Sequence, residues 1–529
     1  MSTRHALAAY GLTFNPRRRR LLEGVAAMGA ASLFPAVSFA QSALQGLPRH
    51  ALVIGNSRYQ SSPLDNPAND AKAITGELKA AGFEVNLLLD TGRDAMVNAI
   101  EAYGKQLASR KAVGLFYFAG HGAQLAWRNY LLPVDAVIKS MDDVPARAVE
   151  LNTLLQGLTK AKNPMNVIVL DACRDNPFGK GLPTEQKGLS QFDAPPGSLL
   201  AYATSPGNVA SDGSGSNGLY TEHLLRELKT PEAKIEDVFK RVRLAVRRRS
   251  NGEQIPWEST SLEEDFYFHP PKVIRKLSDA EATRRFEEEL AIWERIKAAA
   301  EPGPLEDYLR RYPSGLFSEV AQLRLDQVLA KSGERKIDIA SSDQNPFSKG
   351  TLRIDTRVQV GDRYQYREID ADSQSEIRNY TLVSSQVTDT EVIYGKDGFV
   401  TDLLGNFIKL TDGRVFTGAQ YMIPDYSLGK RWTSHHRVIS PKGEQYDTAY
   451  DFKVAARESK AVPAGTFEAF RIEGSGWTRG QSGTNIQLRS RYWVASEVRR
   501  YIEAFFWGRT TRGTLTDNKI VQLTSFTQR

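Results

Sequence analysis

Cysteine is almost absent from this sequence, which contains one in 529 residues. A single thiol cannot form an intramolecular disulfide, so the chain must fold on packed cores alone. Hydrophobic residues make up 41% of the chain. This content and the chain length suit about three independently folding domains. The one thiol is therefore either a core side chain or a reactive group.

Net positive charge is also small once the amino terminus is set aside. Of the net charge of +7, the first forty residues contribute 5 − 1 = +4, through five arginines and one glutamate. No sustained stripe of lysine and arginine follows, as a phosphate-binding face would require. We therefore expect no nucleic-acid partner.

Long apolar runs are missing beyond the first forty residues. Within them, Arg18 and Arg19 precede an alanine-rich stretch from Gly24 to Phe39 that ends in the small-residue site Ser38-Phe39-Ala40. This pattern is typical of a twin-arginine signal peptide over residues 1–40. The alternative, a basic tail with a membrane anchor, needs a longer apolar run than this one, which Pro35 interrupts. We expect export to the periplasm or beyond, and no transmembrane segment in the mature chain.

Residues 48–270 alternate short, continuous apolar runs with amphipathic helical patterns. The runs are Ala51–Ile54, Phe83–Leu89, Val113–Ala119, Val167–Leu170 and Ser198–Ala203. Each is short enough to be a strand buried on both faces. Strands that alternate with helices imply right-handed crossovers. This region is therefore predicted to be an α/β domain with a mostly parallel sheet flanked by helices.

The remaining chain has a different composition. Residues 278–332 are rich in Glu, Arg, Ala and Leu, which predicts short α-helices in tetratricopeptide-like pairs. A polar linker follows over residues 333–350. Residues 351–529 alternate polar with β-branched or aromatic residues between glycine-rich turns. This predicts a mainly antiparallel β domain, in the form of a sheet, a sandwich or an open barrel.

Two of the predicted strands end in residues that can carry chemistry. The third run leads into Gly120-His121-Gly122, and the fourth leads into Asp171-Ala172-Cys173. The carboxyl edge of an open parallel sheet is where sites form. If these strands are neighbours, the imidazole can draw off the proton of a thiol whose ordinary pKa is about 8.5. The backbone N–H groups of Gly122 and Cys173 would then suit an oxyanion hole.

The spacing of 52 residues from His121 to Cys173 (173 − 121 = 52) and the sequence Ala172-Cys173-Arg174 resemble the caspases. In that family the histidine lies about 50 residues before the cysteine. Three segments are similar to recurrent segments of the caspase-like domain of bacterial metacaspase relatives: Ala51–Asn56, Leu64–Ala71 and Tyr130–Asp135. The resemblance implies a cysteine-type endopeptidase acting on a protein or peptide, with His121 as general base and acid, Cys173 as nucleophile and Gly122 as oxyanion donor.

The same resemblance implies a substrate pocket. In metacaspase-like proteins, an aspartate two residues before the nucleophile helps to form an acidic pocket for Arg or Lys preceding the scissile bond. Asp171 holds that position, and a carboxylate suits a guanidinium group. Ser205 and Asp212 follow the next predicted strand and are further candidates for the pocket. Alternatively, Asp171 is the N-cap of a helix. Calcium dependence is not implied.

Three other segments bear on function. Residues 176–197 are rich in Gly and Pro, and we expect an exposed loop that the enzyme cleaves in itself at Lys180 or Lys187. The glycine-rich segment 213–218 does not directly follow a strand, so it predicts a flexible loop and no dinucleotide site. His435-His436 lacks partners at metal-ligand spacing and is interpreted as a surface pair. No cofactor or metal is expected.

Two other functions fit parts of the sequence. The first is an inactive caspase-like scaffold that binds an envelope partner through residues 278–529. Retention of His121, Gly122 and Cys173 favours a peptidase over this scaffold. The second is an acyl hydrolase, which is disfavoured because no G-x-S-x-G elbow occurs.

Overall fold

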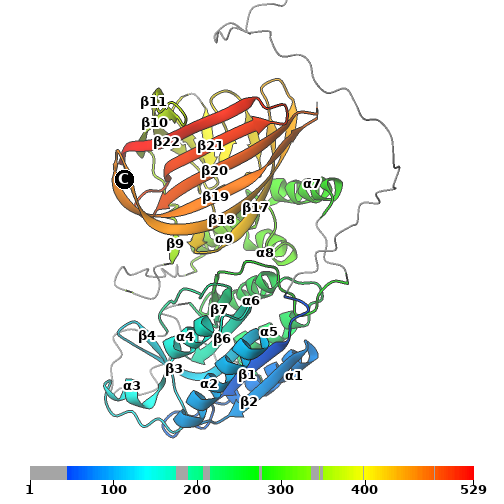
Figure 1. Ribbon diagram of the computed structural model, residues 1–529, viewed down its shortest axis with the longest axis vertical. Coiled ribbons are helices and arrows are strands. Elements are labelled where there is room, and N and C mark those ends of the chain that lie inside the picture. Colours follow the sequence, from blue (N-terminus) through cyan, green and yellow to red (C-terminus); the bar gives the residue numbers. More distant parts are fainter. Residues whose placement is uncertain are drawn as a thin grey trace, which may run out of the picture. The chain divides into compact units, whose positions relative to one another are not determined.

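The computed structural model describes residues 44–173, 189–205, 215–272, 277–334, 345, 350–396, 398–481 and 483–529, with the backbone alone at Cys173 and Asp279. The predicted signal peptide over residues 1–40, Asp212, and most of the predicted linker over 333–350 and of the predicted loop over 176–197 lie outside these residues. Figure 1 shows the arrangement of helices and strands.

The α/β region is built on a sheet with the strand order β2-β1-β3-β6-β7-β8 (Figure 1). The strands are β1 (Arg49–Gly55), β2 (Phe83–Leu89), β3 (Val113–Leu125), β6 (Met165–Cys173), β7 (Ser198–Tyr202) and β8 (Trp257–Thr260). Neighbouring strands are parallel except for β8, which pairs antiparallel with β7. Each predicted apolar run is a strand, and the predicted mostly parallel α/β sheet is confirmed.

Helices cover both faces of this sheet. α1 (Pro67–Ala80), α5 (Leu219–Leu228) and α6 (Ile235–Arg249) share one core with Val53, Tyr117 and Val169 of the strands. α2 (Arg93–Arg110) and α4 (Leu151–Ala161) share a second core with Leu52, Phe116 and Ile168. Successive strand residues therefore enter opposite cores, as the alternation of side chains along a strand requires.

The strand β3 is longer than its apolar run predicts. It continues past Ala119 to Leu125, and its last four residues pair antiparallel with β4 (Arg128–Leu131). The tight turn between them places Ala126 and Trp127 at φ angles of 49° and 65°. The short elements α3 (Asp143–Arg147) and β5 (Val149–Glu150) follow, and β5 pairs with β4. His121 therefore lies within a strand, which fixes its backbone on both sides.

The helical segment contains α7 (Asp279–Ile296), α8 (Pro302–Arg311) and α9 (Ser318–Lys331). Ser278 and Glu281 form a capping box at the start of α7. The buried Glu289 carboxylate accepts hydrogen bonds from Arg285 Nε at 3.0 Å, from the Tyr308 hydroxyl at 3.2 Å and from the Leu316 backbone N–H at 2.7 Å. One carboxylate thus joins α7 to α8 and to the segment before α9.

The carboxyl-terminal region is a closed antiparallel barrel rather than an open one. Its strands are β10 (Arg363–Asp370), β11 (Glu376–Val387), β12 (Glu391–Tyr394), β13 (Phe399–Asp402), β14 (Phe407–Lys409), β15 (Val415–Thr417), β17 (Arg431–Ile439), β18 (Gln445–Val462), β19 (Gly465–Gly480), β20 (Asn485–Ala495), β21 (Tyr501–Thr510) and β22 (Leu515–Thr527). Closure arises because β10 pairs with both β11 and β22. A separate pair joins β9 (Thr351–Arg353) to β16 (Asp425–Ser427). The predicted antiparallel β class is confirmed.

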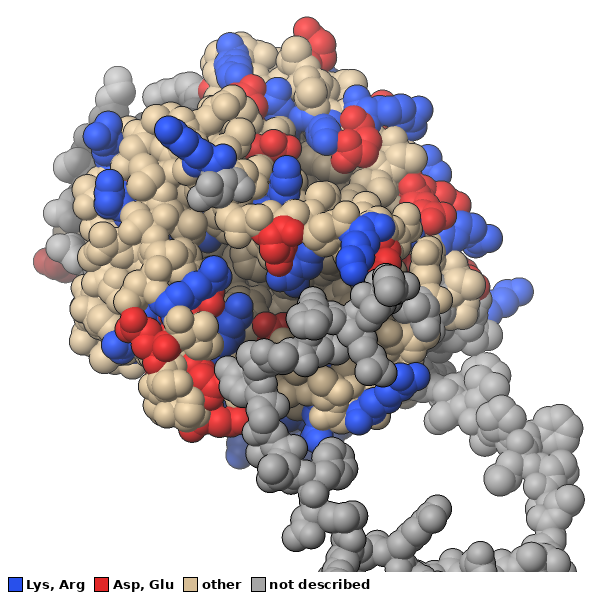
Figure 2. All heavy atoms as spheres, turned by 90° about the horizontal axis from the view of Figure 1, so that it is seen from above, with Lys and Arg blue, Asp and Glu red and all other residues tan. Residues whose placement is uncertain are grey.

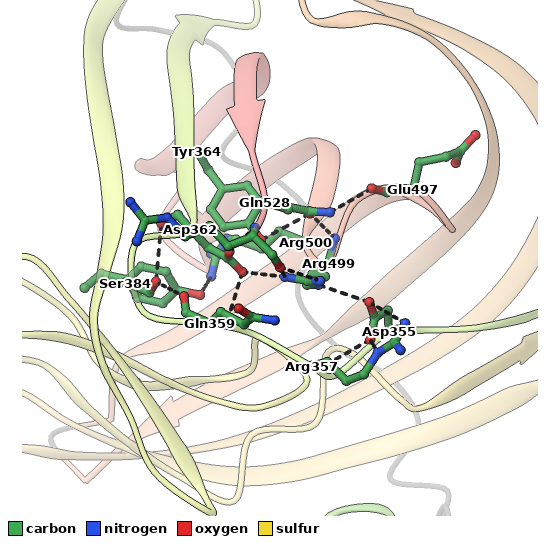
Figure 3. Close-up of polar contacts among 12 residues, drawn as sticks. Asp355, Arg357, Gln359, Asp362, Tyr364, Ser384, Glu497, Arg499, Arg500 and Gln528 are labelled. Carbon is green, nitrogen blue, oxygen red and sulfur yellow. Dashed lines mark hydrogen bonds and ion pairs between the residues drawn. The ribbon is translucent and has the colours of Figure 1, made fainter. Parts of the chain in front are cut away.

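Arg499, in the turn between β20 and β21, ties the end of the chain to the segment before β10 (Figure 3). Its guanidinium lies 3.1 Å from Asp355 Oδ2 and 2.7 Å from Asp362 Oδ2. The Asp362 side chain is 0% exposed and also accepts the Arg529 backbone N–H at 2.9 Å. Hydrogen bonding to Arg357 and Arg499 lowers the pKa of Asp355 to about 2, against the opposing effect of burial.

The interpretation of His435-His436 as a surface pair is wrong for His436. Both residues lie on β17, and successive strand residues face opposite sides. His436 is 2% exposed, with Nε2 at 2.8 Å from the Tyr421 hydroxyl and Nδ1 at 3.1 Å from the Ser434 hydroxyl. Burial lowers the pKa of His436 to about 3, so the imidazole is neutral at physiological pH.

Basic and acidic side chains are interspersed on the face seen in Figure 2. The described residues also include ion pairs between neighbouring strands, such as Arg437 with Asp447 at 2.8 Å across β17 and β18. In the described part of the chain, every helix falls short of the length and apolar character needed to cross a membrane.

Candidate active site

His121 and Cys173 occupy paired backbone positions on neighbouring strands. The register of β3 and β6 aligns Ala119 with Asp171, Gly120 with Ala172 and His121 with Cys173. Neighbouring strands lie about 4.8 Å apart. The two residues proposed from the sequence are therefore brought together at the carboxyl end of the sheet, where sites of parallel sheets form.

The imidazole of His121 is buried and held by a backbone carbonyl. Its Nε2 lies 2.7 Å from the carbonyl oxygen of Ser62. A carbonyl oxygen can only accept a hydrogen bond, so Nε2 carries the proton and Nδ1 has the lone pair in the neutral ring. Nδ1 is therefore the nitrogen that can take up a proton. Ser62 could not be identified from the sequence, because its contribution comes from the backbone.

Tyr59 contacts both the ring and the backbone of His121. The two ring centroids are 4.4 Å apart with an interplanar angle of 53°. The His121 backbone N–H donates to the Tyr59 hydroxyl at 2.9 Å, and this hydroxyl donates to the Leu132 carbonyl at 3.0 Å. Sequence reasoning missed Tyr59, although it lies between two of the segments that carry the family resemblance.

A side chain on either of the glycines beside His121 would crowd its neighbours. Gly120 has a φ of +151°, and a Cβ there would lie 2.5 Å from the Tyr59 hydroxyl. A Cβ on Gly122 would lie 3.0 Å from Leu189 Cδ2 and 3.1 Å from Ala172 Cβ. Gly122 pairs with Leu131 in the hairpin, and the neighbouring Leu132 N–H bonds to the His121 carbonyl. Hydrogen-bonded and non-hydrogen-bonded residue pairs alternate along antiparallel strands, so the Gly122 N–H does not donate to β4.

Asp171 lies within β6, so the alternative of a helix N-cap is wrong. Its Oδ2 accepts a hydrogen bond from Thr221 Oγ1 at 2.6 Å, and the Tyr117 hydroxyl is 3.4 Å away. Tyr117 and Thr221 are themselves 2.6 Å apart. Burial, then the negative charges of Asp171 and Asp70, raise the pKa of Tyr117. The hydroxyls of Thr221 and Tyr117 thus lie against the Asp171 carboxylate.

Asp70, on α1, brings a second carboxylate to the same region. It is buried, and its Oδ1 accepts hydrogen bonds from Asn217 Nδ2 at 2.8 Å and from the Gly218 N–H at 3.0 Å. From the sequence, a second acidic group was expected only after the strand that follows Cys173. Asp70 belongs to the segment Leu64–Ala71 that carries the resemblance, which was the signal available for finding it.

The other pocket candidates are less informative. Ser205 is buried, and its backbone N–H bonds to the Ile255 carbonyl at 2.7 Å. Asp212 lies outside the described residues. Among the residues that the structure describes, no group of three or more His, Cys, Asp or Glu side chains is arranged to hold a metal ion.

Comparison with known proteins gives two similarities. Residues 48–267 match the protein family described as caspase domain. The chain is 28% identical over 179 residues to mucosa-associated lymphoid tissue lymphoma translocation protein 1 of Homo sapiens, and to its homolog of Mus musculus. Each alignment covers 33% of this chain and 21% of the relative, so the chain spans about a fifth of the length of these relatives.

Proposed function

Residues 48–267 form a caspase-like domain, and we propose that the protein is a cysteine endopeptidase that uses His121 and Cys173. The observation that carries this proposal is the backbone register, which pairs His121 with Cys173 across β3 and β6. A thiol needs an adjacent base to react at neutral pH, because its ordinary pKa is about 8.5. His121 is the histidine at that position.

In the proposed reaction, Nδ1 of His121 takes the thiol proton of Cys173, and the thiolate sulfur bonds to the substrate carbonyl carbon. The C–N bond then breaks, and the imidazolium gives its proton to the departing amine. Water, deprotonated by His121, attacks the thioester carbon, which releases the carboxylic acid and restores the thiol. The Ser62 carbonyl holds Nε2–H throughout, so the ring keeps Nδ1 for both proton transfers.

The developing negative charge on the substrate oxygen needs hydrogen-bond donors. The N–H of Gly122, which points away from β4 and towards β6, is the donor we propose for this role, because glycine presents no side chain to the substrate. One donor of this kind accelerates acyl transfer by about 10²–10³-fold.

We further propose that the enzyme prefers Arg or Lys before the scissile bond. Asp171 lies two residues before the nucleophile, and its carboxylate accepts a hydrogen bond from Thr221 on α5. Asp70 adds a second negative charge near Tyr117. Two negative carboxylates in one region favour a cationic side chain that can neutralise them.

The segment over residues 1–40 supports the proposal that the protein is exported through a twin-arginine signal and acts in the periplasm or outside the cell. An envelope protein that binds residues 278–529 remains the proposed partner besides the substrate. Export would be tested by fractionating cells that produce the chain and its Arg18→Lys, Arg19→Lys variant; retention of both in the cytoplasm contradicts export.

The peptidase is tested with the purified full chain and fluorogenic peptides that carry Arg, Lys or Asp before the scissile bond. We expect cleavage after Arg or Lys, and none with Cys173→Ala. Asp171→Asn should lower kcat/KM for the Arg peptide by about 10–100-fold, since a charged hydrogen bond is lost. The matched control is Asp94→Asn, because the Asp94 side chain is 93% exposed.

The outcomes separate the alternatives. Cleavage after Asp, or equal effects of the two Asp→Asn substitutions, contradicts the proposed pocket while leaving the peptidase intact. Absence of cleavage of every peptide by folded protein contradicts the peptidase and favours the inactive scaffold.

A further inference from the structure

We propose that Tyr59 is a positioning residue of this peptidase, which fixes the backbone and the ring of His121 for proton transfer. The inference rests on the proposed function, because it concerns the same pair of residues. It is carried by a closed set of hydrogen bonds around His121 and by the contact between the two rings.

The hydrogen bonds form a circuit. The His121 N–H donates to the Tyr59 hydroxyl, which donates to the Leu132 carbonyl. The Leu132 N–H donates back to the His121 carbonyl at 3.0 Å. The N–H and the C=O of His121 are therefore both hydrogen-bonded, the N–H through the Tyr59 hydroxyl. Loss of the hydroxyl would leave the buried His121 N–H without this acceptor, which is costly in a buried position.

The ring contact acts on the imidazole itself. Tyr59 is buried, and its ring centroid is 4.4 Å from that of His121. This distance restricts rotation of the imidazole. It also places an aromatic ring within the range of about 6 Å at which rings attract cations. The ring thus favours the imidazolium that forms when His121 takes the thiol proton.

The turn that carries Tyr59 is anchored independently of His121. Asp90 Oδ1 accepts the N–H groups of Ser57 at 2.8 Å and of Arg58 at 2.9 Å. The Ser57 hydroxyl accepts the Ala68 N–H at 3.0 Å, at the start of α1. Ser62, three residues after Tyr59, supplies the carbonyl that holds Nε2. This turn therefore supplies the hydrogen bond to the His121 backbone, the contact with its ring and the carbonyl that accepts its Nε2 proton.

Gly120 is consistent with this assignment. A Cβ at position 120 would lie 2.5 Å from the Tyr59 hydroxyl, closer than real Cβ contacts allow. The backbone immediately before His121 thus leaves room for the phenol oxygen. A Gly120→Ala substitution should also displace this hydroxyl, and because Gly120 has a φ of +151° it strains the backbone before His121 as well.

The test uses the fact that Cys173 is the only cysteine of the chain. The rate of alkylation by iodoacetamide between pH 5 and 9 reports the thiolate of Cys173 alone, whether or not a peptide is cleaved. The full chain is compared with Tyr59→Phe, Tyr59→Leu, Gly120→Ala and His121→Ala. Tyr103→Phe is the matched control, because Tyr103 is also buried but packs on His50 at the opposite end of the strands.

We expect the wild-type thiolate to form at a lower pH than in His121→Ala. Tyr59→Phe should move the alkylation profile part of the way towards His121→Ala and lower kcat about tenfold at unchanged KM, as for a loss of orientation. Tyr59→Leu, which also removes the ring, should move the profile further. Tyr103→Phe should match the wild type in both measurements.

Two results separate the inference about Tyr59 from the proposed function. If the wild type and Tyr59→Phe coincide in alkylation profile and in kcat while His121→Ala differs from both, the inference about Tyr59 is overturned and the proposed function stands. If the wild type and His121→Ala coincide, the pairing of His121 with Cys173 fails, and the inference falls with it. Should Tyr59→Leu not fold, Tyr59→Phe decides the question.

Discussion

The buried His436 makes a quantitative prediction about the pH dependence of barrel stability. Its pKa is lowered from 6.5 to about 3 by burial inside the barrel. The unfolded chain therefore binds more protons than the folded chain between these values. The stability that comes from the neutral imidazole is fully present above pH 6.5 and is lost as the pH falls.

The magnitude follows from the size of this shift. Each pH unit below 6.5 costs about 1.4 kcal/mol until the folded-state pKa is approached. The loss at pH 5, relative to pH 8, is therefore about 2 kcal/mol. Asp402 titrates in the same range with the opposite sign, because burial raises its pKa to about 6. The difference between wild type and a variant isolates His436, since Asp402 contributes equally to both.

The variant is His436→Phe, which keeps a ring but cannot be protonated. At pH 8 it should destabilise the barrel by about 1–3 kcal/mol, because Tyr421 and Ser434 lose their partner. Between pH 8 and pH 5 this deficit should shrink by about 2 kcal/mol. His435→Gln is the control, since that neighbouring residue faces the other side of the strand and should leave the slope unchanged.

The assay is urea unfolding of the full chain at pH 5, 6, 7 and 8, read by pulsed hydrogen exchange of peptides from β17 and β18. Local detection is needed because a chain with several folded regions need not unfold in one transition. A difference between wild type and His436→Phe that stays constant across this range would refute the argument, because His436 would then not be held neutral by the fold.

Two further predictions concern Gly122 and Arg499. Gly122→Ala should lower kcat by about 10²-fold, because the added methyl group displaces the proposed oxyanion donor. This methyl group would lie 3.0 Å from Leu189 and 3.1 Å from Ala172. A wild-type kcat in the peptide assay would contradict this role. Arg499→Met should destabilise the barrel by about 3–5 kcal/mol in urea, since it leaves a buried carboxylate without its cation. Its control, Arg414→Met, breaks an exposed pair and should cost less than about 1 kcal/mol; equal losses would rule out the burial argument.

The α/β sheet was predictable because its strands are marked by local pattern. A run such as Val113–Ala119 is buried on both faces, so continuous apolar character is enough to identify it. The pairing of His121 with Cys173 followed from the same pattern, once both strands were taken to end at one edge of the sheet. The residues that contact His121 could not be predicted from that pattern. Ser62 acts through a carbonyl group that every residue possesses, and Tyr59 reaches His121 from 62 positions earlier in the chain.

Barrel closure could not be predicted for a related reason. Alternation of polar and apolar residues marks individual strands, but it does not say which strand pairs with which. The decisive pairing joins β10 to β22, from opposite ends of the region. The error at His436 was avoidable, since alternation along β17 already separates it from His435 onto opposite faces.

The β10–β22 pairing also has a consequence for synthesis of the protein. β10 ends at Asp370 and β22 ends at Thr527, so a ribosome adding about 5–20 residues per second needs roughly 8–30 s to complete the partner of a strand already made. During that interval β10 presents an unpaired strand edge, which is a site for pairing with other chains. Premature release before β22 would leave two such edges on every molecule, so we expect truncated chains to aggregate where complete chains do not.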